Sequence, residues 1–500
     1  MKKIFFRVFL GFLVFCFPSF SQTREMTLNG TIEMATSSSL QAFQAKNLYL
    51  QSYWTFRSYR AARLPSVDLT LTPLTYNRTI TQRYDSEQNL DIYRPQQQLS
   101  SYGELSITQN FDLTGGQFYI NSGLNYIRNM GDYALEQFNT TPIRIGYYQK
   151  LFGFNSFRWE RRIEPLKYEK AKKQFIFDRE QIAETSTQYF FNLAIAQIQY
   201  EMAQKNLAST DTLYRIGKEK HKIASITQTD LLALRLDSIN ARNTLKNAEI
   251  SLKRAMNEYA SFLNLEETDI KLAVPDRPKN ILISAAEAMS QMREHNPDYL
   301  SNRQSVMESE RDLDQSKKSA VFDATVNASV GFNQVATTIG KAYAEPLRQD
   351  LVSIAVSIPI LDWGVRKGQV NVARSRLNTL KLTVQQAEQK LEQDIMVTVD
   401  NFNIQQDIIR SQEEAFEVAN RVYEETRERF ISGLSDLTSL TLALERKENA
   451  QISYITALRD YWLSYYKIRK LTLYDFENKV SLSELFDSEL DSELSKSGGK

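Results

Sequence analysis

Strict alternation between apolar and polar residues marks two segments in the second half of the chain. Phe322 to Phe332 hold a period of two, and Val352 to Ile360 repeat it. Successive side chains of a strand point to opposite faces, so the pattern predicts strands over 321–332 and 351–361. Each run has the ~9 to 11 residues that a tilted strand needs to cross a bilayer. A half-buried strand of a soluble sandwich would show the same pattern.

The first half of the chain contains more alternating runs. The predicted strands are 65–73, 103–113, 116–127 and 142–151. Gly115-Gly116 separates two of them and is a hairpin signal. The polar stretches 77–98 and 129–141 lack periodicity, and we predict that both are long loops.

Long helical segments follow each group of strands. We predict one helical hairpin over 156–265, with a break near 224–229, and another over 364–471, with a break near 432–438. Apolar residues from Ala373 to Ile395 recur at intervals of three and four. This spacing is typical of a coiled-coil seam between packed helices.

The same plan therefore occurs twice in the chain. The first repeat is predicted over 22–273 and the second over 274–475, and each begins with a helix that precedes its strands. Residues 476–500, which end in Gly-Gly-Lys, are predicted to form a flexible C-terminal tail.

The first 21 residues have the features of a secretory signal peptide, predicted over 1–21. Lys2, Lys3 and Arg7 precede an apolar run, and Ser19-Phe20-Ser21 resembles a cleavage site. A first core strand or a short membrane anchor is the alternative. Cys16 is the only cysteine, so the exported chain has no disulfide framework, and lipid attachment at Cys16 stays open.

Composition narrows the function further. The 61 basic and 60 acidic residues leave no basic excess for nucleic acid. With only 17 glycines and 11 prolines, the chain favours few, long elements. Its two histidines, His221 and His295, belong to no zinc motif, and no nucleotide-binding loop occurs. We therefore expect no enzyme, no metal and no cofactor.

The order of these elements resembles the TolC-like outer-membrane efflux protein family. The resemblance rests on the tandem repeat, on Asn296-Pro297, on the run from Ile358 to Gly364 at a strand-to-helix junction, and on the two breaks that would form helical tips. It implies a mixed α and β fold: a homotrimeric outer-membrane β-barrel continued by a long periplasmic α-helical barrel.

The resemblance also implies a function. Such a protein would be the outer-membrane exit duct of a tripartite efflux or type I secretion system. It would conduct substrates passively from a periplasmic adaptor, or membrane fusion protein, and an inner-membrane transporter to the exterior, with outer-membrane lipid around its barrel. The alternative from the pattern alone is an exported helical structural or adhesive protein.

The resemblance places the adaptor contacts at the two tips. The predicted contact residues are Ala224, Ser225, Ile226, Thr227, Gly433, Leu434 and Ser435. The positions where relatives narrow the entrance fall at Phe430, Ser435, Ser439 and Leu442, and none carries the expected group. We hypothesise that Asp230 and Asp436 form an acidic constriction instead. Ordinary solvated charges, or a helix N-cap at Asp230, are the simpler alternative.

Two further expectations concern the membrane. Phe152, Phe154, Trp159 and Trp363 follow the last strands of the repeats and are predicted to form an aromatic girdle at the periplasmic interface, with packing at the barrel base as the alternative. The family usually has two strands per repeat, whereas the first repeat here has four candidates. We predict an extra pair within 99–151, which either widens the barrel or caps it outside.

Overall fold

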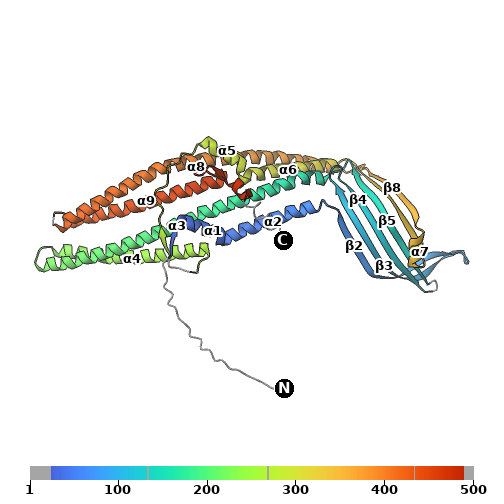
Figure 1. The fold of residues 1–500 in the computed structure, drawn as a ribbon, viewed down its shortest axis with the longest axis horizontal. Helices are drawn as coiled ribbons and strands as arrows, with labels where there is room; N and C mark the ends of the chain where they lie inside the picture. Colours follow the sequence, from blue (N-terminus) through green and yellow to red (C-terminus); the bar gives the residue numbers. More distant parts are fainter. Residues whose placement is uncertain (1–23, 132–133, 267–269, 433, 489–500) are drawn as a thin grey trace, which may run out of the picture. The chain divides into compact units, whose positions relative to one another are not determined.

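The computed structural model describes residues 24–131, 134–266, 270–432 and 434–488 (Figure 1). The predicted signal peptide and Cys16 lie outside these residues. The chain divides into two compact units. One contains the chain up to Gln44, Asp178–Ile283 and Thr398–Lys470; the other contains Ala45–Phe177, Ser284–Val397 and the chain from Leu471. Each unit therefore draws on both halves of the sequence.

Six strands form one antiparallel sheet (Figure 1). In the order of the sheet, they are β2 (Ser66–Asp85), β3 (Leu90–Phe111), β4 (Gly116–Met130), β5 (Leu135–Leu151), β7 (Asp323–Ala336) and β8 (Leu347–Ser357). The first repeat supplies four strands and the second supplies two. The extra pair predicted within 99–151 is thus part of the same sheet as the other strands.

The register gives the sheet one apolar and one polar face. Directly paired residues lie on the same face, and neighbours along a strand lie on opposite faces. One cross-strand row consists of Val67, Ile107, Ile120, Ile145 and Val330, and it ends at Asp350 on β8. The adjacent row consists of Asp68, Ser106, Asn121, Arg144, Gly331 and Gln349. The alternation seen in single strands therefore stays in phase from β2 to β7, whereas β8 places Arg348 and Asp350 on the apolar face.

Two predicted loops are wrong. Within 77–98, β2 continues to Asp85 and β3 begins at Leu90, so only a short turn lies between them. Within 129–141, β4 continues to Met130 and β5 begins at Leu135. Backbone pairing from Thr75↔Ser100 to Asp85↔Leu90 maintains these strands without apolar alternation. The predicted strand 351–361 is also shifted, because β8 ends at Ser357, two residues before Pro359.

The helices of the two repeats match in length. They are α1 (Leu28–Ser38), α2 (Leu40–Ala61), α3 (Ser156–Lys222), α4 (Gln228–Leu263), α5 (Ala285–His295), α6 (Pro297–Ser319), α7 (Ile339–Ala344), α8 (Val365–Ile431) and α9 (Leu437–Thr472). Both α3 and α8 have 67 residues, and both α4 and α9 have 36. At 1.5 Å per residue, the longer helices reach about 100 Å. The two hairpins are copies of one structural unit.

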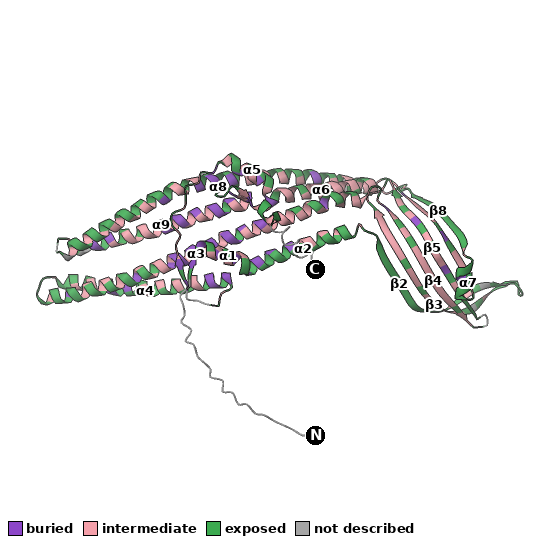
Figure 2. Ribbon diagram, viewed as in Figure 1, coloured by how far each residue is buried: buried purple, intermediate pink, exposed green. Residues whose placement is uncertain are grey.

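Burial along the helices follows narrow stripes (Figure 2). On α8, Leu377, Ile395, Val399 and Phe402 are buried, whereas most residues between them are exposed or half-buried. This is the pattern of a helix that packs side by side with others rather than in a globular core. Among the described helices, none combines the length and the apolar character that a bilayer span requires.

Side-chain amides on the long helices bind extended segments. Gln197 of α3 accepts from the Leu272 N–H (3.2 Å) and donates to the Ile270 carbonyl (2.6 Å), where β6 (Ile270–Ala273) pairs in parallel with β1 (Arg24–Thr27). On α8, Asn403 accepts from the Ile283 N–H (3.2 Å) and donates to its carbonyl (2.9 Å). Each repeat therefore has an amide clamp, by which we mean one amide side chain bonded to both backbone polar groups of an extended segment.

The prediction of a flexible tail is wrong for the described residues up to Ser488. The short strands β9 (Tyr474–Asp475) and β10 (Val480–Ser481) pair with each other. Phe486 packs edge-on against Tyr49, with ring centroids 5.6 Å apart, and Asp487 forms an ion pair with Lys172 at 3.2 Å. Apolar residues spaced through the polar composition anchor this segment on α2 and α3.

Candidate functional site

The first helical tip begins with a left-handed residue. The Ala224 φ is 53°, just beyond the end of α3. The Ala224 N–H donates to the His221 carbonyl (3.0 Å), and the Ser225 N–H donates to the Lys220 carbonyl (2.9 Å). These bonds satisfy carbonyls that the helix end leaves free, as in a Schellman-type termination. The tip is therefore a hydrogen-bonded turn, in which alanine occupies the left-handed position that is usually glycine.

A capping box starts the returning helix, α4. The Thr227 hydroxyl accepts from the Asp230 N–H (3.1 Å), and the Asp230 carboxylate accepts from the Thr227 N–H (3.0 Å). The N-cap is thus Thr227, and the suggestion of Asp230 as N-cap is wrong by three positions. Hydrogen bonds from the Thr227 hydroxyl and N–H lower the pKa of Asp230, so the carboxylate stays ionised.

At the second tip a carboxylate takes the capping position that a hydroxyl occupies at the first tip. Asp436 immediately precedes α9, and its carboxylate accepts from the Ser439 N–H at 2.7 Å. Bonds from the Ser439 N–H and hydroxyl lower the pKa of Asp436. The Leu434 N–H donates to the Arg429 carbonyl at 2.8 Å, which closes the end of α8. Gly433, a predicted contact residue, lies outside the described residues.

Apolar side chains are exposed at both tips. Ile223 is 73% exposed and Leu434 is 71% exposed. A shallow groove at the second tip is lined by Thr426, Arg429, Leu434, Ser435, Asp436 and Ser439. Single exposed apolar residues are common, but here they lie beside charged and hydroxyl side chains at the extreme end of each hairpin. The tips can offer both an apolar contact and hydrogen-bonding groups.

The predicted tip residues have different surroundings. Ala224, Ser225 and Thr227 are exposed, whereas Ile226 is half-buried and its carbonyl lies 3.1 Å from His221 Nδ1. Asp230 and Asp436 are exposed; Asp230 lies in the first turn of α4, and Asp436 immediately precedes α9. Their joint role in an acidic constriction stays a prediction.

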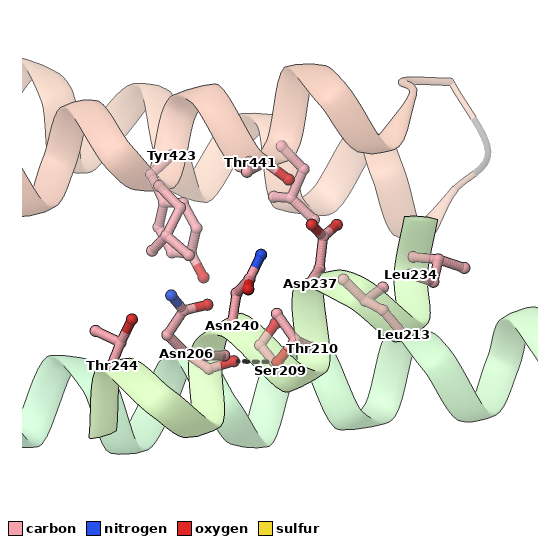
Figure 3. Close-up of a pocket in the computed structure, with 13 residues that line it drawn as sticks. Asn206, Ser209, Thr210, Leu213, Leu234, Asp237, Asn240, Thr244, Tyr423 and Thr441 are labelled. Atoms are coloured by element: carbon pink, nitrogen blue, oxygen red, sulfur yellow. Dashed lines mark hydrogen bonds between the residues drawn. The ribbon is translucent and has the colours of Figure 1, made fainter. Parts of the chain in front are cut away.

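A cavity of about 220 Å³ lies between the two helical hairpins, lined both by polar side chains and by Leu213, Leu234, Leu440 and Leu444 (Figure 3). Its lining includes Asn206 and Thr210 of α3, Asp237 and Asn240 of α4, Tyr423 of α8 and Thr441 of α9. Tyr423 and Thr441 point from one hairpin towards the side chains of the other (Figure 3). The sequence does not predict this cavity, because its lining comes from four different helices. The packing between the two hairpins is thus interrupted here by a cavity.

The predicted girdle residues separate into two kinds. Phe152 and Trp363 are 79% and 88% exposed, and both have positive φ, at 58° and 55°. Trp159 instead lies on α3, where its indole N–H donates to the Asp314 carboxylate of α6 at 3.0 Å. Phe154 is half-buried. The residue of the first repeat that matches Trp363 is therefore Phe152, not Trp159, and the shared signal is an aromatic residue followed by glycine.

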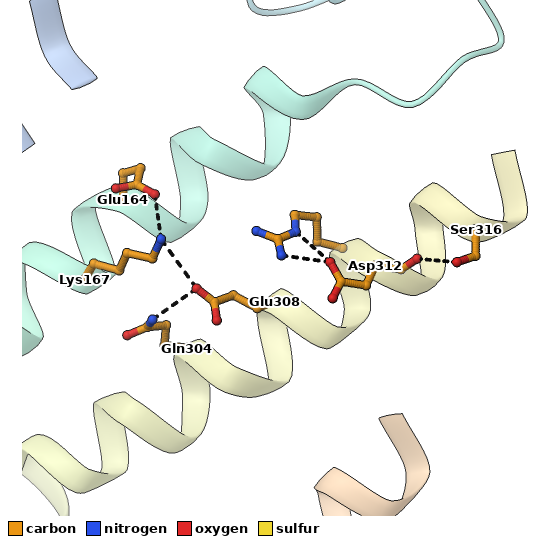
Figure 4. Close-up of polar contacts among 7 residues, drawn as sticks. Glu164, Lys167, Gln304, Glu308, Asp312 and Ser316 are labelled. Carbon is orange, nitrogen blue, oxygen red and sulfur yellow. Dashed lines mark hydrogen bonds and ion pairs between the residues drawn. The ribbon is translucent and has the colours of Figure 1, made fainter. Parts of the chain in front are cut away.

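Ion pairs join α3 and α6 where they leave the sheet. Lys167 lies 2.9 Å from Glu164 and 3.5 Å from Glu308, which also accepts from Gln304 at 3.0 Å (Figure 4). Such half-exposed pairs hold helices in register and contribute little free energy individually. Within the described residues, no three His, Cys, Asp or Glu side chains gather into a group that could hold a metal.

Comparison with known proteins defines the class. The fold matches an outer-membrane channel of Campylobacter jejuni, CmeC (TM-score 0.65, 14% identity, 93% of this chain and 89% of that chain). It also matches the outer membrane protein VceC of Vibrio cholerae (TM-score 0.61, 14% identity, 89% and 95%). The chain has the fold of the outer-membrane channels, which are mixed helical and sheet proteins.

A family model matches part of the sequence. Residues 288–472 match the outer membrane efflux protein family. An uncharacterised Haemophilus influenzae protein is 22% identical over 273 residues, a match that covers 52% of this chain and 58% of the relative's length. The predicted mixed helical and sheet fold class is confirmed, and the matched segment agrees with the predicted resemblance to outer-membrane efflux proteins.

Proposed function

We propose that the protein is the passive exit duct of a tripartite efflux or type I secretion system. The observation that carries the proposal is a sheet with one apolar face, joined by the 67-residue helices α3 and α8 to hairpin tips with exposed apolar side chains. The sheet suits lipid on one side and water on the other. Efflux through an outer-membrane channel is the activity that the family match supports.

The proposed partners follow from surfaces that one chain leaves incomplete. Among the described strands, the two edges of the sheet have no partner within the chain, and these edges together with the half-exposed helices favour a homotrimer. Ile223 and Leu434 at the tips would contact a periplasmic adaptor, which joins the duct to an inner-membrane transporter. The cavity between the hairpins supports an iris-like opening at the tips, because the two hairpins are not close-packed there.

Export is tested by deletion. Loss of the gene should sensitise cells to the transporter's substrates, and the intact chain should restore resistance only where the transporter is present. Restoration without any transporter would contradict the tripartite proposal. Absence of trimers from outer-membrane fractions would instead favour an exported structural or adhesive protein.

Adaptor docking is tested by cross-linking. Ser225→Cys and Ser435→Cys place a single reactive thiol at each tip of the exported chain, which the predicted signal cleavage leaves without cysteine. Each should cross-link to a periplasmic adaptor. Ser251→Cys, an exposed serine on α4 away from the tip, is the matched control and should not. Equal cross-linking of the adaptor to Ser251→Cys would contradict the assignment of the adaptor contacts to the tips.

A further inference from the structure

The two strands beyond the usual family number lie inside the sheet. β3 and β4 are hydrogen-bonded on both sides, to β2 and β5 as well as to each other. All six strands have between 11 and 22 residues, at least the ~9 to 11 that a tilted strand needs to span a bilayer. A hairpin folded over the outside of a barrel would not occupy these interior positions.

The apolar face continues through the additional strands. In the row from Val67 to Val330, the residues on β3 and β4 are Ile107 and Ile120. On the opposite face, the same two strands supply Ser106 and Asn121. These strands therefore have the lipid-facing and water-facing sides that the rest of the sheet has.

The outer edges of the sheet require a partner. β2 and β8 each pair on one side only among the described strands. Unpaired backbone groups within lipid cost several kcal/mol each, so an open edge does not persist there. Since six consecutive antiparallel strands alternate in direction, β8 of one copy and β2 of the next are antiparallel and can pair.

We propose that three copies close into one eighteen-stranded barrel whose water-filled pore is about twice as wide as that of a twelve-stranded barrel. Six strands per chain give this number, and the proposal rests on the trimer of the proposed function. With strands ~4.8 Å apart and tilted by ~40°, the backbone radius is about 18 Å for eighteen strands and about 12 Å for twelve. A side-chain layer of ~5 Å leaves free diameters of about 26 Å and about 14 Å.

The wider pore changes which substrates can leave. A single helix is ~10 to 12 Å across and two packed helices are about 20 Å across. A polypeptide hairpin or a branched polymer therefore fits the wider pore and not the narrower one. The lining row carries Asp68 and Arg144, so charges of both signs face the water and select weakly between cations and anions.

Strand counting tests the proposal directly. Electron cryomicroscopy of the full-length trimer should show six barrel strands per chain and β8 paired with β2 of the next copy. Four barrel strands per chain, with a hairpin outside the wall, would overturn it. Either result is independent of the deletion phenotype, so failure of export and failure of the wide pore are distinguishable.

Polymer access tests the pore width in cells. Ser329 lies on β7, paired with Gly146 on the water-facing side, so Ser329→Cys places a thiol in the lumen. A small maleimide and a maleimide-polyethylene glycol about 20 Å across should both label it from outside. Labelling by the small reagent alone would contradict a wide pore.

Two deletions refine this measurement. Removing residues 90–130 takes out β3 and β4 and joins the outer end of β2 to that of β5, so the large reagent should be excluded while the small one still reacts. The matched control replaces residues 81–94 with Asn-Gly. This change shortens the β2–β3 hairpin mostly where β3 does not pair with β4, so the six-stranded part of the sheet stays intact. Its labelling should equal that of the full-length chain. If the 90–130 deletion yields no trimer, the full-length protein and the control still decide the question.

Discussion

The amide clamp on α8 makes a quantitative prediction. Asn403→Ala removes both hydrogen bonds to Ile283, at 3.2 Å and 2.9 Å, while α8 itself keeps its backbone bonds. Ile283 is only 3% exposed, so water cannot readily replace the lost partner. The segment around Ile283 should then open locally more often than in the parent protein.

The size of the expected effect on local opening follows from the burial of Ile283. A net hydrogen bond contributes ~0.5 to 1.5 kcal/mol, and an unsatisfied buried N–H costs ~1 to 3 kcal/mol. Together these give a loss of about 2 to 3 kcal/mol in the free energy of local opening. At ~1.4 kcal/mol per tenfold, amide exchange at Ile283 should be about 30- to 150-fold faster.

Hydrogen exchange measured by mass spectrometry on the purified trimer tests this prediction. Asn401→Ala is the matched control, because Asn401 is an exposed amide on the same helix two residues away. It should leave exchange at Ile283 unchanged. Equal protection in Asn403→Ala and the parent would refute the clamp, and faster exchange throughout α8 would show that the substitution unfolds the helix instead.

Three other predictions concern the tips and the membrane interface. Hydrogen bonding lowers the pKa of Asp230 and Asp436, so both carboxylates stay charged until the pH falls through those depressed values. The cation preference of the channel, measured from reversal potentials, should therefore be equal at pH 8 and pH 5. It should fall in the variant that carries both Asp230→Asn and Asp436→Asn. Phe152→Leu and Trp363→Leu keep the left-handed backbone but lose the ring, so the trimer in outer-membrane extracts should dissociate at a lower temperature on heat-modifiability gels. Trp159→Phe keeps the ring but removes its hydrogen bond to α6, and about 1 kcal/mol of lost stability should appear as a lower unfolding temperature of the purified protein.

The strands could be predicted from the sequence where apolar and polar residues alternate, but their continuation into polar segments could not. Val67, Leu69 and Leu71 mark the start of β2, but the strand continues to Asp85 through mostly polar residues. There the cross-strand backbone bonds maintain the pairing, and these bonds leave no hydrophobic period in the sequence. Sequence patterns therefore located the strands and underestimated their length.

The tips were located from sequence, whereas their internal bonds needed coordinates. Thr227 to Asp230 matches the capping-box pattern, and Asp436 to Ser439 carries the same groups in exchanged positions. A carboxylate and a hydroxyl three residues apart can cap a helix in either order, because each offers an oxygen to a free backbone N–H. The cavity behind the tips depends on four helices at once, so no local pattern indicates it.

The two repeats have helical hairpins of equal length but contribute different numbers of strands to the sheet. The two helices of each hairpin have 67 and 36 residues in both copies, which suits the proposed helical wall, where equivalent hairpins would pack against one another. The sheet has four strands from one repeat and two from the other. An added antiparallel hairpin satisfies its own backbone bonds, returns the chain to the side from which it came, and leaves the edge strands able to pair. The width of the membrane pore can therefore change by whole hairpins while the tips that would meet a partner keep their geometry.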